Sequence, residues 1–435
     1  MSRLPLSLAL ASLVTWAHSL PTDPSPPPTP PWSGSGCGPV ASLFNQSVEA
    51  WNTANTGPWL DAWWAINEGT FNNTDGGFAA EFGRQFLGNP DWTCRDDGSG
   101  SDCDLDPCGV AALNNAGADM APAYYVLEST NRLHSYFAGL SQSLETSAIG
   151  AALATDSWTE TFYTYKGAID MSGLKELIGV LETLVGIAAA AAGPFAVTLI
   201  EQAALGATRA IFTAAGSAAT AHIKQGQDDT FQKAADVGAA LSQLFMASIK
   251  DMVTGNNVLM GGNSFEGAGD IRTFIQNGSY VAFEGIDKVA TTNSMNAMLT
   301  GAAINRLWRQ QKVYIMGGGA CDDSSGLGTG PQANKVCRDG KAWYLYFWDE
   351  DHHWTLTHYQ WGWVDGPPGA DQLGTGEYAG ITVQDVINSS LDAYNVAEYA
   401  YTYQTLHDNA LDALSTGLAN PAASGPAWQG IFNIP

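Results

Sequence analysis

The sequence predicts an α+β protein that is mainly α-helical, with an Ala-rich helical body and a smaller C-terminal β-hairpin or sheet part, stabilised by disulfides. Three observations support this fold class. Apolar residues recur at three-and-four spacing in several long segments, which is typical of amphipathic helices. Residues 174–223 are rich in alanine and very apolar. From residue 343 onward, an aromatic run followed by the alternating stretch "HWTLTHYQW" indicates strands.

Helices are expected in three amphipathic segments. One begins near Ala121, one runs from Phe231 to a stop at Gly255, and one near the C-terminus begins at a capping box of Thr382 and Asp385 and ends before Gly417. The apolar positions expected to be buried in the first of these helices are Tyr125, Leu133, Tyr136, Phe137, Leu140 and Leu144.

Residues 174–223 allow two interpretations. They could form a membrane-inserting hairpin, as in a membrane-active toxin or effector, or two helices buried in the core. Gly193-Pro194 should break the helix, and the apolar runs on either side fall short of the roughly 20 residues that a span requires. We therefore expect core helices and no stable membrane span.

Strands are expected around the stretch "WYLYFWDEDHHWTLTHYQW". Trp343, Leu345 and Phe347 should face one side of a strand, and Tyr344, Tyr346 and Trp348 the other. The acidic "DED" at 349–351 should turn the chain into a second strand over 353–361, and residues 312–316 should add a strand nearby.

The domain organisation follows from composition. Residues 1–19 are typical of a secretory signal peptide, and residues 20–35 of a Pro-rich spacer. A mainly helical region is expected over 36–255 and an α+β region over 256–435, with any break in the Gly/Asn-rich residues 254–270. Whether these regions form one domain or two stays open, as does the oligomeric state.

Charge and cysteine content indicate an extracellular protein. The chain holds 43 acidic and 18 basic residues, a formal net charge of −25 that disfavours nucleic acid as a partner. In an exported chain the six cysteines suggest disulfides. We pair Cys321 with Cys337, whereas Cys37, Cys94, Cys103 and Cys108 allow three connectivities. Four sequons predict surface glycosylation, at Asn45, Asn72, Asn277 and Asn388.

The aromatic hairpin is the first candidate site. Its tryptophans could stack on sugar rings, and nearby carboxylates could hold hydroxyls or act as acid and base. The tryptophans are Trp348, Trp354, Trp361 and Trp363, and the carboxylates are Asp349, Glu350, Asp351 and Asp365. With His352, His353 and His358 the same tip could bind a metal, but the spacing matches no known ligand motif, and a solvated turn is the alternative.

The Cys-rich loop "CRDDGSGSDCDLDPC" is the second candidate site. Its carboxylates, Asp97, Asp102, Asp104 and Asp106, are suited to a structural calcium ion, although the EF-hand pattern is absent. The alternative is a solvated, disulfide-tethered loop. We expect no other cofactor, and the nucleotide-binding and hydrolase motifs are missing.

The signal peptide, the Pro-rich spacer, the motif "DWTCRDDGSGSDCDLDPC", the Ala-rich middle and the aromatic hairpin together resemble secreted fungal proteins of a domain-of-unknown-function family. The resemblance implies an extracellular role such as cell-wall or substrate interaction, or a secreted effector, and attaches no activity to any residue. The sequence thus predicts a secreted glycoprotein that binds or processes glycan, with polysaccharide as its partner. The alternatives are the membrane-active protein and a non-catalytic interaction protein.

Overall fold

The computed structural model describes residues 45–96, 103–105, 119–163, 169–170, 230–231, 246, 249–250, 252–264, 269–283, 285, 287–322, 332–349, 363–397 and 432–435. The helices are α2 (Val48–Thr53), α3 (Thr56–Phe71), α4 (Gly77–Phe86), α6 (Met120–Phe162), α10 (Ile271–Ile275), η5 (Ser279–Ala282), α11 (Lys288–Gln310), η6 (Gln332–Asn334), η7 (Ala370–Gln372) and α12 (Val383–Ala397). The strands are β1 (Ile169–Asp170), β2 (Thr230–Phe231), β3 (Tyr314–Ala320), β4 (Lys335–Arg338), β5 (Lys341–Asp349) and β6 (Trp363–Asp365). The prediction of a mainly helical protein with a small β part is confirmed.

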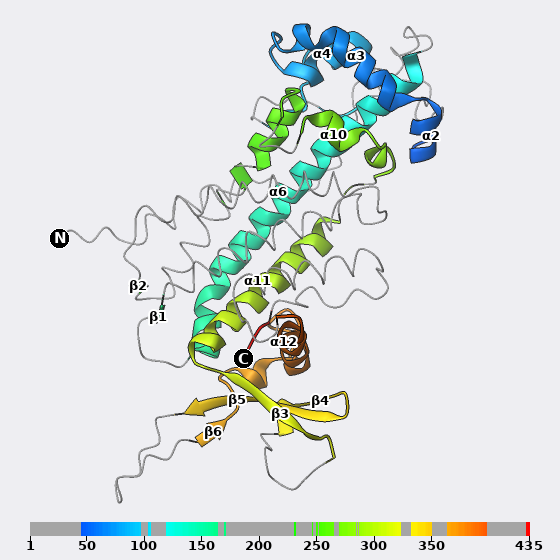
Figure 1. The fold of residues 1–435 in the computed structure, drawn as a ribbon. Helices are drawn as coiled ribbons and strands as arrows, with labels where there is room; N and C mark the ends of the chain where they lie inside the picture. Colours follow the sequence, from blue (N-terminus) through cyan, green and yellow to red (C-terminus); the bar gives the residue numbers. More distant parts are fainter. Residues whose placement is uncertain are drawn as a thin grey trace, which may run out of the picture.

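The 43-residue helix α6 is the long axis of the described structure (Figure 1). The short helices α2, α3, α4 and α10 lie at its N-terminal end, and the sheet and α12 lie at the other end. All six positions predicted to be buried on α6 are buried. Helix α11 runs beside the C-terminal half of α6 in the same direction, because Ser143 and Ser147 contact the start of α11, while Gln311, just after α11, bonds to Phe162 at the end of α6.

Aromatic side chains build the core at the N-terminal end of α6. The ring of Trp63 lies 4.8 Å from that of Phe82, and the ring of Trp64 lies 4.6 Å from that of Phe71. The guanidinium of Arg272 lies 4.3 Å above the Trp64 ring, which is a cation–π contact. These early tryptophans are therefore core residues.

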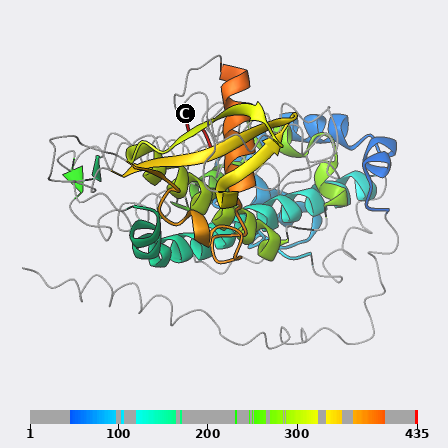
Figure 2. The ribbon, with the colours of Figure 1, turned by 90° about the horizontal axis from the view of Figure 1, so that it is seen from below.

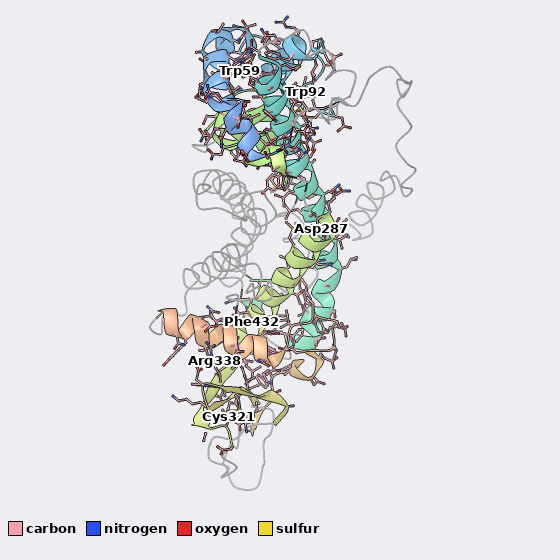
Figure 3. The ribbon with its side chains drawn as sticks, turned by 90° about the vertical axis from the view of Figure 1, so that its right-hand side faces the viewer. Trp59, Trp92, Asp287, Cys321, Arg338 and Phe432 are labelled. Carbon is pink, nitrogen blue, oxygen red and sulfur yellow. A yellow bond between two sulfur atoms is a disulfide. The ribbon has the colours of Figure 1, made fainter. Side chains whose placement is uncertain are left out.

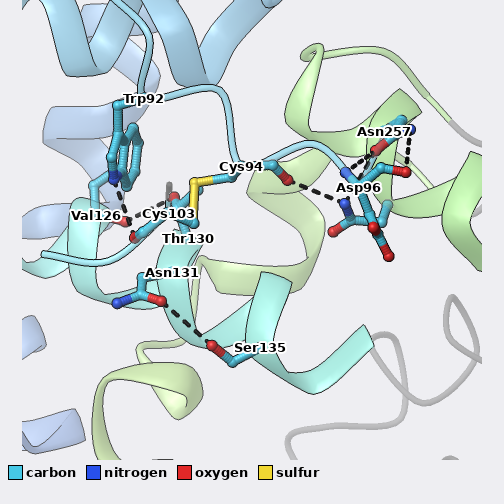
Figure 4. The surroundings of a disulfide bond; sticks show 10 residues. Trp92, Cys94, Asp96, Cys103, Val126, Thr130, Asn131, Ser135 and Asn257 are labelled. Atoms are coloured by element: carbon cyan, nitrogen blue, oxygen red, sulfur yellow. Dashed lines mark hydrogen bonds between the residues drawn. A yellow bond between two sulfur atoms is a disulfide. The ribbon is translucent and has the colours of Figure 1, made fainter. Parts of the chain in front are cut away.

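A disulfide joins Cys94 to Cys103, with their Cα atoms 4.6 Å apart (Figure 4). The indole of Trp92 donates to the Cys103 carbonyl at 3.1 Å, and Asn256 Nδ2 donates to the Cys94 carbonyl at 3.1 Å. The disulfide is thus tied to the helix that contains Asn256. The other two cysteines of this group, Cys37 and Cys108, lie outside the described residues.

The structure differs from the helix predicted from Phe231 to Gly255 at both ends of that segment. Phe231 lies in the short strand β2 and pairs with Ile169. At the other end, residues 252–260 are helical through Gly255. A glycine inside a helix costs only about 1 kcal/mol relative to alanine, so it need not stop one. The turn comes at Gly262, where φ is +83° and an added Cβ would lie 2.8 Å from the Phe71 ring.

The C-terminal sheet is antiparallel, with the strand order β3-β5-β4 and β6 paired to the end of β5 (Figure 2). The predicted strand near 312–316 is confirmed as β3, and Cys321 pairs with Cys337 as predicted. The alternation along β5 is also confirmed. Trp343, Leu345 and Phe347 join the main core, whereas Tyr344 and Tyr346 belong to a second cluster on the other face. The predicted strand over 353–361 lies outside the described residues.

The predicted capping box begins α12. The backbone N–H of Asp385 donates to Thr382 Oγ1 at 3.1 Å, and that of Thr382 donates to Asp385 Oδ2 at 2.8 Å. Val386, Ile387 and Leu391 of α12 join the core that also includes Leu345. Arg338 of β4 bonds to Asp392 and to the Asn388 carbonyl, which fastens the helix to the sheet.

The main hydrophobic cluster contains residues from both predicted regions, from Trp51 to Ile434. Among the helices that the structure describes, none is long and apolar enough to cross a bilayer. Residues 174–223, on which the membrane alternative depends, lie outside the described residues, as do the predicted helix end at Gly417, the signal peptide and the spacer.

Candidate functional site

The predicted aromatic site is described only along its strand backbones. Antiparallel pairing sets Phe347 opposite Asp365, Trp348 opposite Val364 and Asp349 opposite Trp363. Asp349 and Asp365 thus lie on neighbouring strands at one end of the sheet, offset by two positions. The remaining candidates lie outside the described residues, namely Glu350, Asp351, His352, His353, Trp354, His358 and Trp361.

Of the predicted calcium ligands, the structure describes Asp104, which is exposed. Asp97, Asp102 and Asp106 lie outside the described residues. Within the described ranges, no three His, Cys, Asp or Glu side chains come together in a group that could hold a metal ion. The neighbouring Asp96 instead anchors the loop through its backbone, because its N–H donates to Asn257 Oδ1 at 2.8 Å (Figure 4).

The four sequons differ in exposure. Asn45 and Asn72 are exposed, whereas Asn277 and Asn388 are half-buried. Asn388 lies inside α12, and the two serines that follow it, Ser389 and Ser390, are buried. In the folded chain, the side-chain amides of Asn45 and Asn72 are therefore more accessible for glycosylation than those of the other two.

A pocket of about 700 Å³ lies where α6, α11 and the loop around Tyr378 meet. At Gly150 an added Cβ would make an ordinary van der Waals contact, 3.6 Å from Asn296 Oδ1 of α11. This volume falls within the usual range of small-molecule sites, roughly 300–1,000 Å³. The fold thus forms a ligand-sized hollow in a region that the sequence did not single out.

The lining of this pocket mixes polar and apolar residues. Six residues supply hydroxyl, amide or carboxylate groups, namely Ser157, Asn293, Asn296, Thr300, Glu377 and Tyr378. The small residues Gly150, Ala151 and Ala154 leave room on the α6 side, and the lining also includes the largely buried Trp158. Glu377 is the single charged group among the described lining residues.

Tyr378 is held firmly at the edge of the pocket. Its hydroxyl lies 2.9 Å from Thr161 Oγ1 and 3.4 Å from Ser157 Oγ, and its ring lies 4.7 Å from that of Phe162. The next residue, Ala379, has a φ of +55°, which a non-glycine residue adopts only at a cost. These contacts place the 376–379 loop against the end of α6 and so complete the pocket.

A second polar-aromatic group lies on the sheet. The rings of Tyr314 and Tyr346 are stacked at 5.6 Å, and Tyr344 lies 6.1 Å from Tyr346. Burial raises the pKa of the Tyr346 hydroxyl, and the neighbouring Tyr344 and Tyr314 raise it further. The raised pKa keeps the Tyr346 phenol neutral at physiological pH, and the three rings pack together on this face of the sheet.

Sequence reasoning missed the pocket because its walls come from three distant segments. One local signal was available: Gly150, Ala151 and Ala154 place small residues along α6, while Asn293 and Asn296 stand three apart on α11, on one side of that helix. Only the packing of α6 against α11 shows that the two sets face each other.

Comparison of the chain with protein-family models, curated proteins and solved structures finds no match.

Proposed function

We propose that this chain is a secreted glycoprotein that binds a glycan, or a similar neutral and hydroxyl-rich ligand, in the pocket between α6, α11 and the 376–379 loop. The observation that carries the proposal is the lining, which combines residues with amide and hydroxyl groups with the aromatic residues Trp158 and Tyr378. Sugars require this combination, because their hydroxyls seek hydrogen-bond partners while their C–H faces pack on apolar surface.

The same lining favours binding over hydrolysis. Glycoside cleavage generally uses two carboxyl groups, about 5–5.5 Å apart in retaining enzymes and roughly 6.5–9.5 Å apart in inverting ones. Glu377 is the only carboxylate among the described lining residues. A formal charge of −25 on the whole chain also disfavours anionic ligands, which is consistent with a neutral glycan.

The test is a pull-down of the glycosylated protein on chitin, β-glucan and cellulose, with sugar release measured in the same tubes. Titration calorimetry with soluble oligosaccharides of the polysaccharide that binds then gives the affinity. We expect binding without release. Release of soluble sugar would instead make the protein an enzyme, and failure to bind any of the three would favour a non-catalytic protein-interaction role.

Two substitutions at Gly150 locate the binding site. Gly150→Phe fills the pocket from an exposed helix position and should weaken binding at least tenfold, or about 1.4 kcal/mol. Gly150→Ala is the matched control, because its Cβ makes only an ordinary 3.6 Å contact with Asn296 and should leave binding unchanged. If both variants bind the polysaccharide as the natural chain does, the ligand lies elsewhere.

A further inference from the structure

The segment Phe432–Pro435 is inserted among elements far from it in sequence. Phe432, Asn433 and Ile434 are each at most 1% exposed, and the side chains of Phe432 and Ile434 belong to the main core (Figure 3). Residues 398–431, which join the segment to α12, lie outside the described part of the chain. The segment itself is neither helix nor strand, so its backbone groups need partners from elsewhere.

Those partners come from α11, α12 and β3. The N–H of Phe432 donates to Ser389 Oγ at 3.1 Å, the N–H of Asn433 donates to Asn305 Oδ1 at 3.1 Å, and the N–H of Ile434 donates to Ser390 Oγ at 3.1 Å. The carbonyl of Pro435 accepts from the N–H of Ile315 in β3 at 2.7 Å. Each residue of the segment is thus bonded through its backbone.

The Asn433 side chain adds sequence discrimination. Its Oδ1 accepts hydrogen bonds from Asn305 Nδ2 and from the guanidinium of Arg309, both at 2.9 Å. Asn305 therefore contacts position 433 through both its donor and its acceptor. A residue without an amide or carboxyl oxygen there would remove the acceptor of the buried Asn305 Nδ2, which costs about 1–3 kcal/mol for a neutral group.

We propose that α11, α12 and β3 form a peptide-binding groove, and that the segment Phe432–Pro435 is its separable ligand. The groove recognises an extended peptide with the order aromatic, Asn, aliphatic, and holds the residue that follows through its backbone carbonyl. A second copy of the segment, free or from another molecule of this chain, replaces the first. This inference is independent of the glycan pocket, which involves other residues of α11.

The test uses the full chain with Asn433→Ala, which weakens the resident segment and leaves the groove intact. The probe is a labelled peptide with the sequence of residues 430–435, Gly-Ile-Phe-Asn-Ile-Pro. Binding is followed by fluorescence anisotropy and by the rise in Tm. The peptide should bind this variant at least tenfold more tightly than the natural chain, where the attached segment competes at an effective concentration on the order of millimolar.

Two controls make the result specific to the groove. A peptide with Ala in place of Asn should bind neither chain, and adding Asn305→Ala to the Asn433→Ala chain should abolish binding of the Asn peptide. A folded Asn433→Ala chain that ignores the Asn peptide, or that binds both peptides equally, would overturn the proposal.

If the Asn433→Ala chain does not fold, hydrogen exchange of the natural chain decides the question. An excess of the Asn peptide should then displace the resident segment and speed exchange at the amides of Phe432, Asn433 and Ile434. Exchange that the peptide leaves unchanged would show that the segment is a fixed part of the core.

Discussion

Gly278 and Gly88 show how one residue type has different consequences at different positions. Both have nearly the same left-handed backbone, with φ of +66° and +68°. A Cβ at Gly278 would lie 2.5 Å from Cγ of Trp51, whereas at Gly88 no atom lies within 4 Å. The backbone strain is therefore shared, and only Gly278 adds a collision with the core.

Gly278→Ala should lower the free energy of unfolding by roughly 2–4 kcal/mol, because it combines left-handed strain with overpacking against Trp51. Gly88→Ala, the matched control, should cost only about 1 kcal/mol from the strain alone. Urea unfolding followed by tryptophan fluorescence measures both. Equal losses would mean that Trp51 can move aside without cost.

His134 predicts part of the pH dependence of stability. Burial lowers the pKa of its imidazole below the usual 6.5, although Asn256, Asp96, Asp104 and the Cys94 carbonyl partly offset this effect. The unfolded chain therefore takes up the proton at a higher pH than the folded chain. The stability contributed by the buried, neutral His134 imidazole is fully present above about pH 6.5. It is lost as the pH falls toward the lower pKa of the folded state.

His134→Gln should remove this contribution, so that the variant loses less stability than the natural chain between pH 7 and pH 5. The other six histidines are common to both chains and cancel in the difference. Urea titrations at several pH values measure this difference. Between pH 7 and pH 8 the free energies of unfolding of the two chains should change in parallel with pH. A steeper acid loss in the variant would contradict the lowered pKa.

At the level of the element, local sequence signals were most reliable where the physical interaction is itself local. The capping box at α12 was predicted from two residues three apart, and both of its hydrogen bonds are present. The alternation along β5 was predicted for the same reason, since neighbouring side chains of a strand point to opposite faces. Gly255 failed as a helix stop because tertiary packing outweighs a penalty of about 1 kcal/mol.

Thr382→Ala should destabilise the protein by about 1 kcal/mol through loss of the N-cap bond to the Asp385 N–H. Thr146→Ala is the control, since this exposed threonine lies inside α6 and bonds only to the Gln142 carbonyl one turn earlier. Its removal should change stability by less than about 0.5 kcal/mol. Thermal unfolding of both variants measures the difference, and equal effects would argue against the cap.

For the whole molecule, Trp308 joins the long helices to the C-terminal part. Its ring lies 5.7 Å from that of Phe162 at the end of α6, and its indole N–H donates to the Pro368 carbonyl at 3.0 Å. The side chain is fully buried in the cluster that contains residues from both predicted regions. Its packing therefore connects α6, α11 and the loop that leads to the pocket.

Trp308→Ala should cost about 3–5 kcal/mol, because it opens a large cavity and leaves the Pro368 carbonyl without this donor. Ile66→Ala serves as the control, since Ile66 is 80% exposed and its loss should cost less than about 0.5 kcal/mol. Circular dichroism with urea measures both. A loss below about 1 kcal/mol for Trp308→Ala would show that the packing of the long helices against the C-terminal part does not depend on this contact.

The sequence by itself determined the helical class, the buried face of α6, the faces of β5, the cap of α12 and the pairing of Cys321 with Cys337. Each depends on periodicity or on groups close together along the chain. Only the tertiary structure decided the pairing of Cys94 with Cys103, the pocket at Gly150 and the insertion of Phe432–Pro435 between α11, α12 and β3. The pocket and the inserted segment join residues tens to hundreds of positions apart, and such contacts arise from packing that no local pattern encodes. Cys94 and Cys103 are only nine positions apart, but together with Cys37 and Cys108 they allowed three connectivities, so their pairing was decided by the fold.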